Sequence, residues 1–223
     1  MKILVLNGSP KEKSDTMVLT NAFFLFFNKS GNHEITVLNI IEKKIAPCRG
    51  CFGCWKVKNK HCLIDDDQNQ ILDLYPEVDL IIWSFPLYCY GMPSHIKAVL
   101  DRTIPLTQMT MEIVDGITRH VPMVDFSKIH TVVISGCGFP NYEHNFEGLS
   151  RQCDLCFGNL TKIFVPETPL LNISEAKPVA DQKIAAFESA GEEYAEKLCL
   201  APETIESLQS LMISKEEYIR NIG

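Results

Sequence analysis

A short loop near the start of the chain carries residue types that bind phosphate. It joins an apolar run at residues 2–6 to an apolar helical pattern at 16–27, and it contains hydroxyl donors and a lysine at Ser9, Ser14, Thr16 and Lys11. The free N–H groups of the first helical turn add donors and a positive dipole end. Neither the GxxxxGK[ST] nor the GxGxxG spacing occurs, so a single terminal phosphate suits the loop better than a triphosphate or dinucleotide. An ordinary strand-to-helix turn is the alternative.

Two further loops suit a flat ring. One offers an apolar and aromatic surface with backbone amides, at Pro86, Leu87, Tyr88, Cys89 and Tyr90. The other lets backbone lie close to a ring edge, at Ser135, Gly136, Cys137 and Gly138. A planar heteroaromatic ring needs a stacking surface and N–H donors at its polar edge. With the first loop, they indicate a mononucleotide, whereas simple loop packing is the alternative interpretation of the tyrosines.

Four cysteines follow the spacing C-x2-C-x2-C-x7-C, at Cys48, Cys51, Cys54 and Cys62. Four thiolates in one short segment can hold a [4Fe–4S] cluster. They can also hold zinc, although two adjacent CxxC steps crowd a tetrahedral site. A redox dithiol made by Cys51 with Cys48 or Cys54 is a further interpretation, and so is a set of small buried residues. The spacing leaves these interpretations open.

The elements that must position these residues predict an α/β fold. Five apolar runs are typical of strands buried on both faces, at residues 2–6, 34–40, 79–85, 129–135 and 161–165. Helical patterns alternate with them, at residues 16–27, 65–75, 94–103, 141–157, 179–199 and 202–219. This alternation predicts a parallel sheet covered on both faces. Because ligands bind outside the carboxyl ends of such strands, the three loops should converge at one edge.

Two segments need separate comment. Residues 104–127 show no clear period, and we expect an excursion before the fourth strand. The acidic run Asp65-Asp66-Asp67 opens a predicted helix, where the positive end of the helix dipole explains it better than a metal does.

The composition excludes several partners. The chain has 223 residues, of which 46% are hydrophobic and 22% charged, and its formal net charge is −7. A nucleic-acid-binding face would have to be basic, so no nucleic acid is expected as a partner. No apolar run has the length of a membrane-spanning helix, and the apolar start is too short for a signal peptide. We expect a cytoplasmic protein, in which nine cysteines indicate metal, redox chemistry or burial before disulfides.

Together, the motifs resemble those of the flavodoxin-like NAD(P)H-dependent FMN reductases, including the iron–sulfur flavoproteins. The matching stretches, in family order, are KILVLNGSPKEKSDT, PCRGCFGCWKVKNKHCLIDDD, DLIIWSFPLYCYGMPSHIKAVLDR and ISGCGFP. The resemblance implies a flavodoxin-like doubly wound five-stranded parallel sheet of order 2-1-3-4-5 in residues 1–166. The cysteine-rich loop 47–63 would be inserted after the second strand, and residues 167–223 would form a C-terminal helical extension packed on the same domain.

The resemblance also implies where FMN would bind. The isoalloxazine would lie against residues 86–90 and 136–138, and the phosphate on Ser9, Ser14, Asp15 and Thr16. Asp15 departs from the family, which more often has Asn or another neutral residue there. A carboxylate beside a phosphate is unfavourable, so we expect the Asp15 backbone N–H to bind while its side chain turns away. The four clustered cysteines would hold a [4Fe–4S] cluster, and the protein would be a homo-oligomer, a dimer or a tetramer.

The implied function is that of a flavin oxidoreductase. NAD(P)H would reduce FMN, which would pass electrons to a quinone-like or other small molecule, or to a protein. Because FMN carries this chemistry, no catalytic side chain is expected. The alternative is an iron–sulfur flavoprotein that acts as electron carrier or redox sensor without a small-molecule substrate of its own. A flavin-free structural or zinc module is a third possibility.

Overall fold

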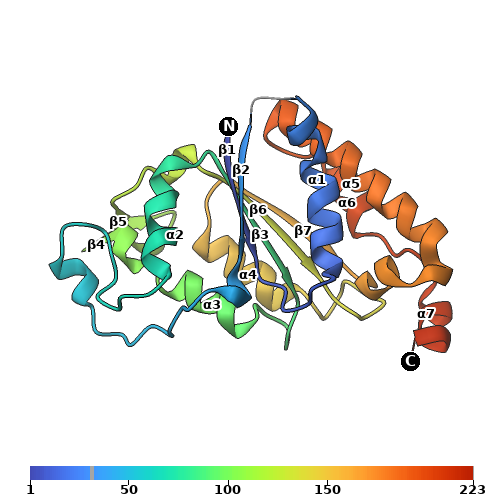
Figure 1. The fold of residues 1–223 in the computed structure, drawn as a ribbon, viewed down its shortest axis with the longest axis horizontal. Coiled ribbons are helices and arrows are strands. Elements are labelled where there is room, and N and C mark those ends of the chain that lie inside the picture. The colour runs from blue at the N-terminus through green and yellow to red at the C-terminus, as the bar shows by residue number, and fades with distance from the viewer. Residues whose placement is uncertain (31–32, 223) are drawn as a thin grey trace.

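The computed structural model describes residues 1–30 and 33–222 (Figure 1). At its centre is a five-stranded parallel sheet of order β2-β1-β3-β6-β7. Its strands are β1 (Lys2–Asn7), β2 (Glu34–Asn39), β3 (Leu80–Pro86), β6 (His130–Gly136) and β7 (Leu160–Val165). All five lie where the apolar runs predict strands. The order 2-1-3-4-5 is confirmed, because β6 and β7 are the fourth and fifth strands of this sheet.

Helices cover both faces of the sheet (Figure 1). The helices on one face are α1 (Asp15–Ser30), α5 (Lys177–Lys197) and α6 (Pro202–Gln209). Those on the other are α2 (Gln68–Leu74), α3 (Ser94–Asp101) and α4 (Glu147–Cys156). A last helix, α7 (Lys215–Ile222), ends the described chain. No helix among residues 1–30 and 33–222 is long and apolar enough to cross a membrane.

The first strand shows why the sequences of the sheet strands are continuously apolar. Leu4 and Leu6 belong to the core under α2, α3 and α4. Ile3 and Val5 belong to the core under α1 and α5. All four side chains are buried, because both faces of a parallel sheet are covered by helices.

The excursion at 104–127 contains an antiparallel hairpin that periodicity did not reveal. Its strands are β4 (Thr107–Val114) and β5 (Ile117–Pro122). The turn residues Asp115 and Gly116 both have positive φ, +50° and +77°. Asp-Gly is the favoured pair for such a turn, so this dipeptide was the available signal.

Helix α2 begins at Gln68, after the acidic run Asp65-Asp66-Asp67 that was expected to open it. Two other predicted helices differ more from their patterns. Helix α4 begins at Glu147 and not at 141, because His144 has a φ of +67°, which no right-handed helix accommodates. The pattern at 202–219 is divided between α6 and α7. There, the buried Lys183 ammonium donates to the carbonyls of Ser207, Leu208 and Ser210. A lysine that satisfies the last carbonyls stabilises a helix end.

Candidate functional site

The loops that follow β1, β3 and β6 surround a cavity of about 120 Å³ at the carboxyl ends of the strands. Candidate residues from all three loops line it, namely Ser9, Lys11, Asp15, Thr16, Pro86, Leu87, Tyr88, Gly136, Cys137 and Gly138. The predicted convergence of the loops at one sheet edge is therefore present in the structure. The other candidates, Ser14, Cys89, Tyr90 and Ser135, lie outside the lining.

The first loop is fixed to the sheet through Gly8. Its N–H donates to the Ser84 carbonyl at 2.7 Å, and its carbonyl lies 2.7 Å from His95 Nε2. Because a carbonyl can only accept, His95 donates here from Nε2. A Cβ at Gly8 would lie 2.7 Å from Ile96 Cδ1 and 3.0 Å from Phe85 Cβ. The glycine therefore permits a close approach between this loop and α3.

Ser14 caps α1 from behind the cavity. Its Oγ accepts from the Met17 N–H at 3.1 Å, and its carbonyl accepts from Val18 at 3.1 Å. The amides of Asp15 and Thr16 precede this first intrahelical hydrogen bond, so the helix offers them no acceptor. The Thr16 and Ser9 side chains are buried, and both residues line the cavity. Amides and hydroxyls at a helix start are the donors that an anion requires.

The Asp15 carboxylate has partners of its own. It accepts from Lys11 Nζ at 3.1 Å and from the Asn172 side-chain amide. Asn172 follows β7, so this contact joins the first loop to a segment far away in sequence. The negative charge is paired with Lys11, which lowers the repulsion that an anion in the cavity would meet.

The second and third loops diverge where the pairing of β3 with β6 ends, at Pro86 and Gly136. Beyond it, Leu87 N–H donates to the Gly136 carbonyl at 2.8 Å. Cys89 and Tyr90 form the exposed tip of the second loop, with φ of +47° and +62°. Non-glycine residues rarely adopt this conformation, so the tip carries backbone strain.

Ser135 lies within β6, below the cavity. It is fully buried, and among the described residues its hydroxyl has no hydrogen-bond partner. Its position in the strand follows from the register, in which it pairs with Phe85 and Phe164.

A fourth loop completes the cavity and was not predicted. Thr168 and Pro169, which follow β7, line it. Thr168 donates to the Cys137 carbonyl from its N–H at 3.0 Å and from its hydroxyl at 3.2 Å. A Cβ at Gly136 would lie 2.4 Å from Thr168 Cγ2, so glycine is needed there. Ligands bind outside the carboxyl ends of parallel strands, so the same argument could have included the Pro-containing loop after the fifth strand.

The clustered cysteines surround a second, smaller hollow. Cys48, Cys51, Cys54 and Cys62 all line it, and its volume is about 20 Å³. Burial, followed by the nearby Cys62 and Cys51 thiols, raises the pKa of Cys54. Within the part of the chain that the structure describes, no three ligating side chains converge in metal-binding positions. The fold thus gathers the four thiols around one hollow, but it does not hold them in the coordination geometry of a metal site.

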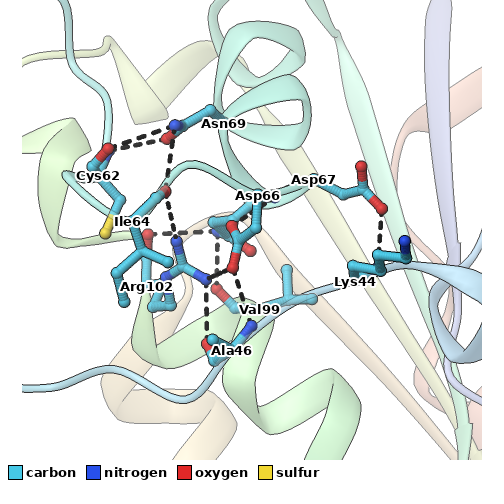
Figure 2. A network of polar contacts seen from close by, with 10 residues as sticks. Lys44, Ala46, Cys62, Ile64, Asp66, Asp67, Asn69, Val99 and Arg102 are labelled. Carbon is cyan, nitrogen blue, oxygen red and sulfur yellow. Dashed lines mark hydrogen bonds and ion pairs between the residues drawn. The ribbon is translucent and has the colours of Figure 1, made fainter.

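Arg102, immediately after α3, lines this hollow, and Figure 2 shows its polar partners. Its side chain is 1% exposed and donates to Asp66 Oδ2 at 2.6 Å, to the Ala46 carbonyl at 3.0 Å and to the Ile64 carbonyl at 3.3 Å. Burial opposes ionisation of Asp66, but the Arg102 hydrogen bond and backbone donors prevail and lower its pKa. Burial also disfavours the charged guanidinium, yet Asp66 and Cys62 hold the pKa of Arg102 above its ordinary value.

The acidic run is therefore more than a helix cap. Asp66 does accept from the first-turn amide of Gln68 at 3.2 Å, as the dipole argument predicts. It also accepts from Ala46 N–H at 2.9 Å, and Asp67 accepts from Lys44 N–H at 2.7 Å. The run fastens the segment before the cysteines to α2, a contact invisible in the local pattern.

A family model described as flavodoxin-like fold matches residues 1–198. The chain belongs to this flavodoxin-like family. Two similar proteins are iron–sulfur flavoproteins, from Methanocaldococcus jannaschii (33% identical over 106 residues) and Methanosarcina thermophila (31% over 106 residues). The matches cover 48% of this chain and 53% and 54% of the relatives, so the chain spans about half the length of the curated relatives it matches.

Solved structures share the fold across most of this flavodoxin-like chain. An azoreductase from Bacillus anthracis superposes with a TM-score of 0.62 at 13% identity, covering 88% of this chain and 99% of its own. An NAD(P)H:quinone oxidoreductase from Methanothermobacter marburgensis gives 0.60 at 14% identity, covering 86% and 97%. At such identities the likeness establishes the fold.

Cys153 of this flavodoxin-like protein should be inert in the native state. It is fully buried in α4, and burial raises the pKa of its thiol to about 12. Only the thiolate reacts with alkylating agents, so at pH 8 Cys153 should remain unlabelled by iodoacetamide while the exposed Cys199 is labelled. Mass spectrometry of digested protein checks this, with denatured protein as the control in which both react. Equal native labelling rates would contradict it.

Proposed function

We propose that this protein is an FMN-dependent oxidoreductase that passes electrons from NAD(P)H through bound FMN to a small-molecule or protein acceptor. The observation that carries the proposal is the cavity at the carboxyl edge of the sheet. The buried Ser9 and Thr16 at the start of α1 line it, together with residues of the loops after β3 and β6. This combination matches a ligand with one phosphate and one flat ring.

In this proposal, the phosphate lies at the start of α1. Ser9 and Thr16 donate from their hydroxyls, and Asp15 and Thr16 from their amides. Ser14 supports them by capping the helix, and Lys11 keeps the Asp15 charge neutralised. The ring would lie against residues 86–88 and 136–138, which line the cavity, and Cys89, Tyr90 and Ser135 adjoin those stretches in the chain.

FMN, when bound, supplies the hydride-accepting and electron-donating chemistry. The chain itself orients the ring and limits the access of water. The contacts of Leu87 with Gly136 and of Thr168 with Cys137 hold the ring-facing loops at a fixed separation. Tyr218 of α7 adds a hydrogen bond to the Gly138 carbonyl at 2.8 Å. No side chain of the cavity is needed as acid, base or nucleophile.

The names of similar proteins support this assignment. A Bacillus anthracis structure described as an FMN-dependent NADH-azoreductase in complex with FMN shares the fold, with a TM-score of 0.62 at 14% identity. The related quinone oxidoreductase suggests quinone-like acceptors.

A visible absorption spectrum of the purified protein, followed by anaerobic addition of NADH or NADPH, tests the proposal. We expect flavin bands, with added FMN if necessary, that bleach on addition of one of the nucleotides and recover with a quinone. A protein that stays colourless with FMN would contradict flavin binding. A bound flavin that neither nucleotide reduces would contradict the reductase assignment.

The cysteine hollow favours a second candidate function, that of an iron–sulfur flavoprotein acting as electron carrier or redox sensor. Its basis is that all four clustered thiols line one hollow, and the similar archaeal proteins are named iron–sulfur flavoproteins. Anaerobically purified protein should then contain about four iron and four acid-labile sulfide per chain. Turnover with nucleotide and quinone distinguishes this carrier from the reductase.

We further propose a cytoplasmic homo-oligomer, a dimer or tetramer, in which residues 167–223 pack on the domain formed by residues 1–166. Exposed apolar side chains on β4 support self-association, because such patches mark interaction sites: Met109, Met111 and Ile113. Light scattering on the purified protein measures the assembly. A strictly monomeric protein would contradict it.

A further inference from the structure

Arg102 stands out as a fully buried cation outside the flavin cavity. Its carbonyl accepts from the Gln68 side-chain amide at 3.2 Å, so main chain and side chain are both held. Its Nε is buried without a hydrogen-bond partner among the described residues. Buried charges are retained where they are paired or where they serve a ligand.

The guanidinium fixes both ends of the cysteine segment. It donates to the carbonyl of Ala46, two residues before Cys48, and to that of Ile64, two residues after Cys62. Figure 2 shows Arg102 between the segments that contain Ala46 and Ile64, and Asp66 accepts a hydrogen bond from the Ala46 N–H. The two ends of the intervening cysteine loop are thereby held together, and Cys48 and Cys51 within it are exposed.

The positive charge of Arg102 indicates what kind of group the cysteines would hold. Arg102 lines the same hollow as the four thiols. Four thiolates around zinc carry two net negative charges, and so does an oxidised [4Fe–4S] cluster with its thiolates. Asp66 pairs with Arg102 at 2.6 Å but does not line the hollow, so of this ion pair only the guanidinium lies in the wall shared with the thiols. A guanidinium in the wall of the hollow attracts a negatively charged metal–thiolate group more strongly than it attracts uncharged side chains that only fill space.

We propose that Arg102 is a positioning residue for a dianionic metal–thiolate group held by Cys48, Cys51, Cys54 and Cys62. It sets the span of the loop through Ala46 and Ile64 and supplies the compensating charge. This inference rests on the second candidate function, namely metal binding by the cysteines, and is independent of FMN.

The test compares variants of the full chain after anaerobic reconstitution with ferrous iron and sulfide, or with zinc alone. The double variant Arg102→Gln with Asp66→Asn removes both charges, so that neither is left buried and unpaired. Asp66→Asn alone keeps the cation, and Arg102→Lys keeps the charge without the two-pronged geometry. The exposed Lys128→Gln is the matched control for loss of a positive charge.

We expect the double variant to bind metal ~10–100-fold more weakly, as for other residues that orient ligands, and any iron cluster to have a more negative midpoint potential. Arg102→Lys should restore part of the affinity, whereas Asp66→Asn and Lys128→Gln should retain it. Equal loss in Asp66→Asn would show that Arg102 acts only through the fold and would overturn the proposal. So would wild-type affinity in the double variant, or wild-type protein that binds neither iron nor zinc.

Two readouts keep the outcomes separate. Thermal melts of metal-free protein show whether each variant folds. If the double variant does not fold, Arg102→Lys provides the test. Wild-type metal affinity of Arg102→Lys would then overturn the positioning role. Flavin content and its reduction by NAD(P)H are measured on the same samples. Loss of metal binding with an intact, reducible flavin would contradict only the cysteine-site proposal. Loss of flavin binding with intact metal binding would contradict only the oxidoreductase proposal.

Discussion

Replacing Ser9 with aspartate is expected to lower the affinity for FMN by at least ~100-fold, because two like charges about 4 Å apart repel by roughly 4 kcal/mol at an effective dielectric constant of about 20. Ser9 is buried and lines the cavity beside the start of α1. Its hydroxyl accepts from Lys11 N–H at 3.3 Å, and an aspartate oxygen can accept that hydrogen bond too. The fold should therefore survive, and the effect should appear in binding.

Fluorescence titration with FMN measures the dissociation constant, and thermal melts confirm folding. Ser9→Ala is the matched control, because it removes one hydrogen bond without adding charge and should cost about 1 kcal/mol, roughly a fivefold change in affinity. Gln182→Glu adds the same charge at an exposed position of α5 and should leave the affinity for FMN unchanged. FMN affinity of Ser9→Asp within a few-fold of that of Ser9→Ala would place the phosphate elsewhere.

Gly191→Ala in α5 should destabilise the protein, although alanine is the better helix former by about 1 kcal/mol. A Cβ at Gly191 would lie 1.9 Å from the Phe23 carbonyl oxygen and 2.8 Å from its carbon. The obstacle is backbone of α1, so the two helices must separate. Their packing includes the Phe23 and Tyr194 rings, whose centroids are 5.5 Å apart. Overpacking costs about 1–3 kcal/mol or more, and this contact belongs at the upper end.

We therefore expect the free energy of unfolding to fall by about 2 kcal/mol, and Tm by roughly 4–8 °C for a chain of this size. Urea denaturation and calorimetry measure both. Gly148→Ala in α4 is the control, because its Cβ would meet only Tyr90 O at an ordinary 3.6 Å. That variant should be neutral or slightly more stable. A Gly191→Ala protein as stable as wild type would refute the close approach of α1 and α5.

The sequence by itself determined the features that depend on local pattern. The strands of the sheet are readable because burial on both faces makes them continuously apolar, as at residues 2–6. Ser14 could be predicted as a cap because capping needs only a residue type and its distance to Met17. The hairpin at Asp115-Gly116 was also readable, since its turn signal is local.

Only the tertiary structure decided the contacts between segments far apart in the chain. The interruption of the helical pattern at 202–219 lies where Lys183 donates to the Ser210 carbonyl. The Asp15 carboxylate accepts a hydrogen bond from Asn172. Thr168 reaches the cavity because β7 lies beside β6. The position of Arg102, which lines the same hollow as the four cysteines, is the clearest case. It arises where α3, α2 and the cysteine segment meet, and a periodic pattern along the chain carries no information about which charges meet across the fold.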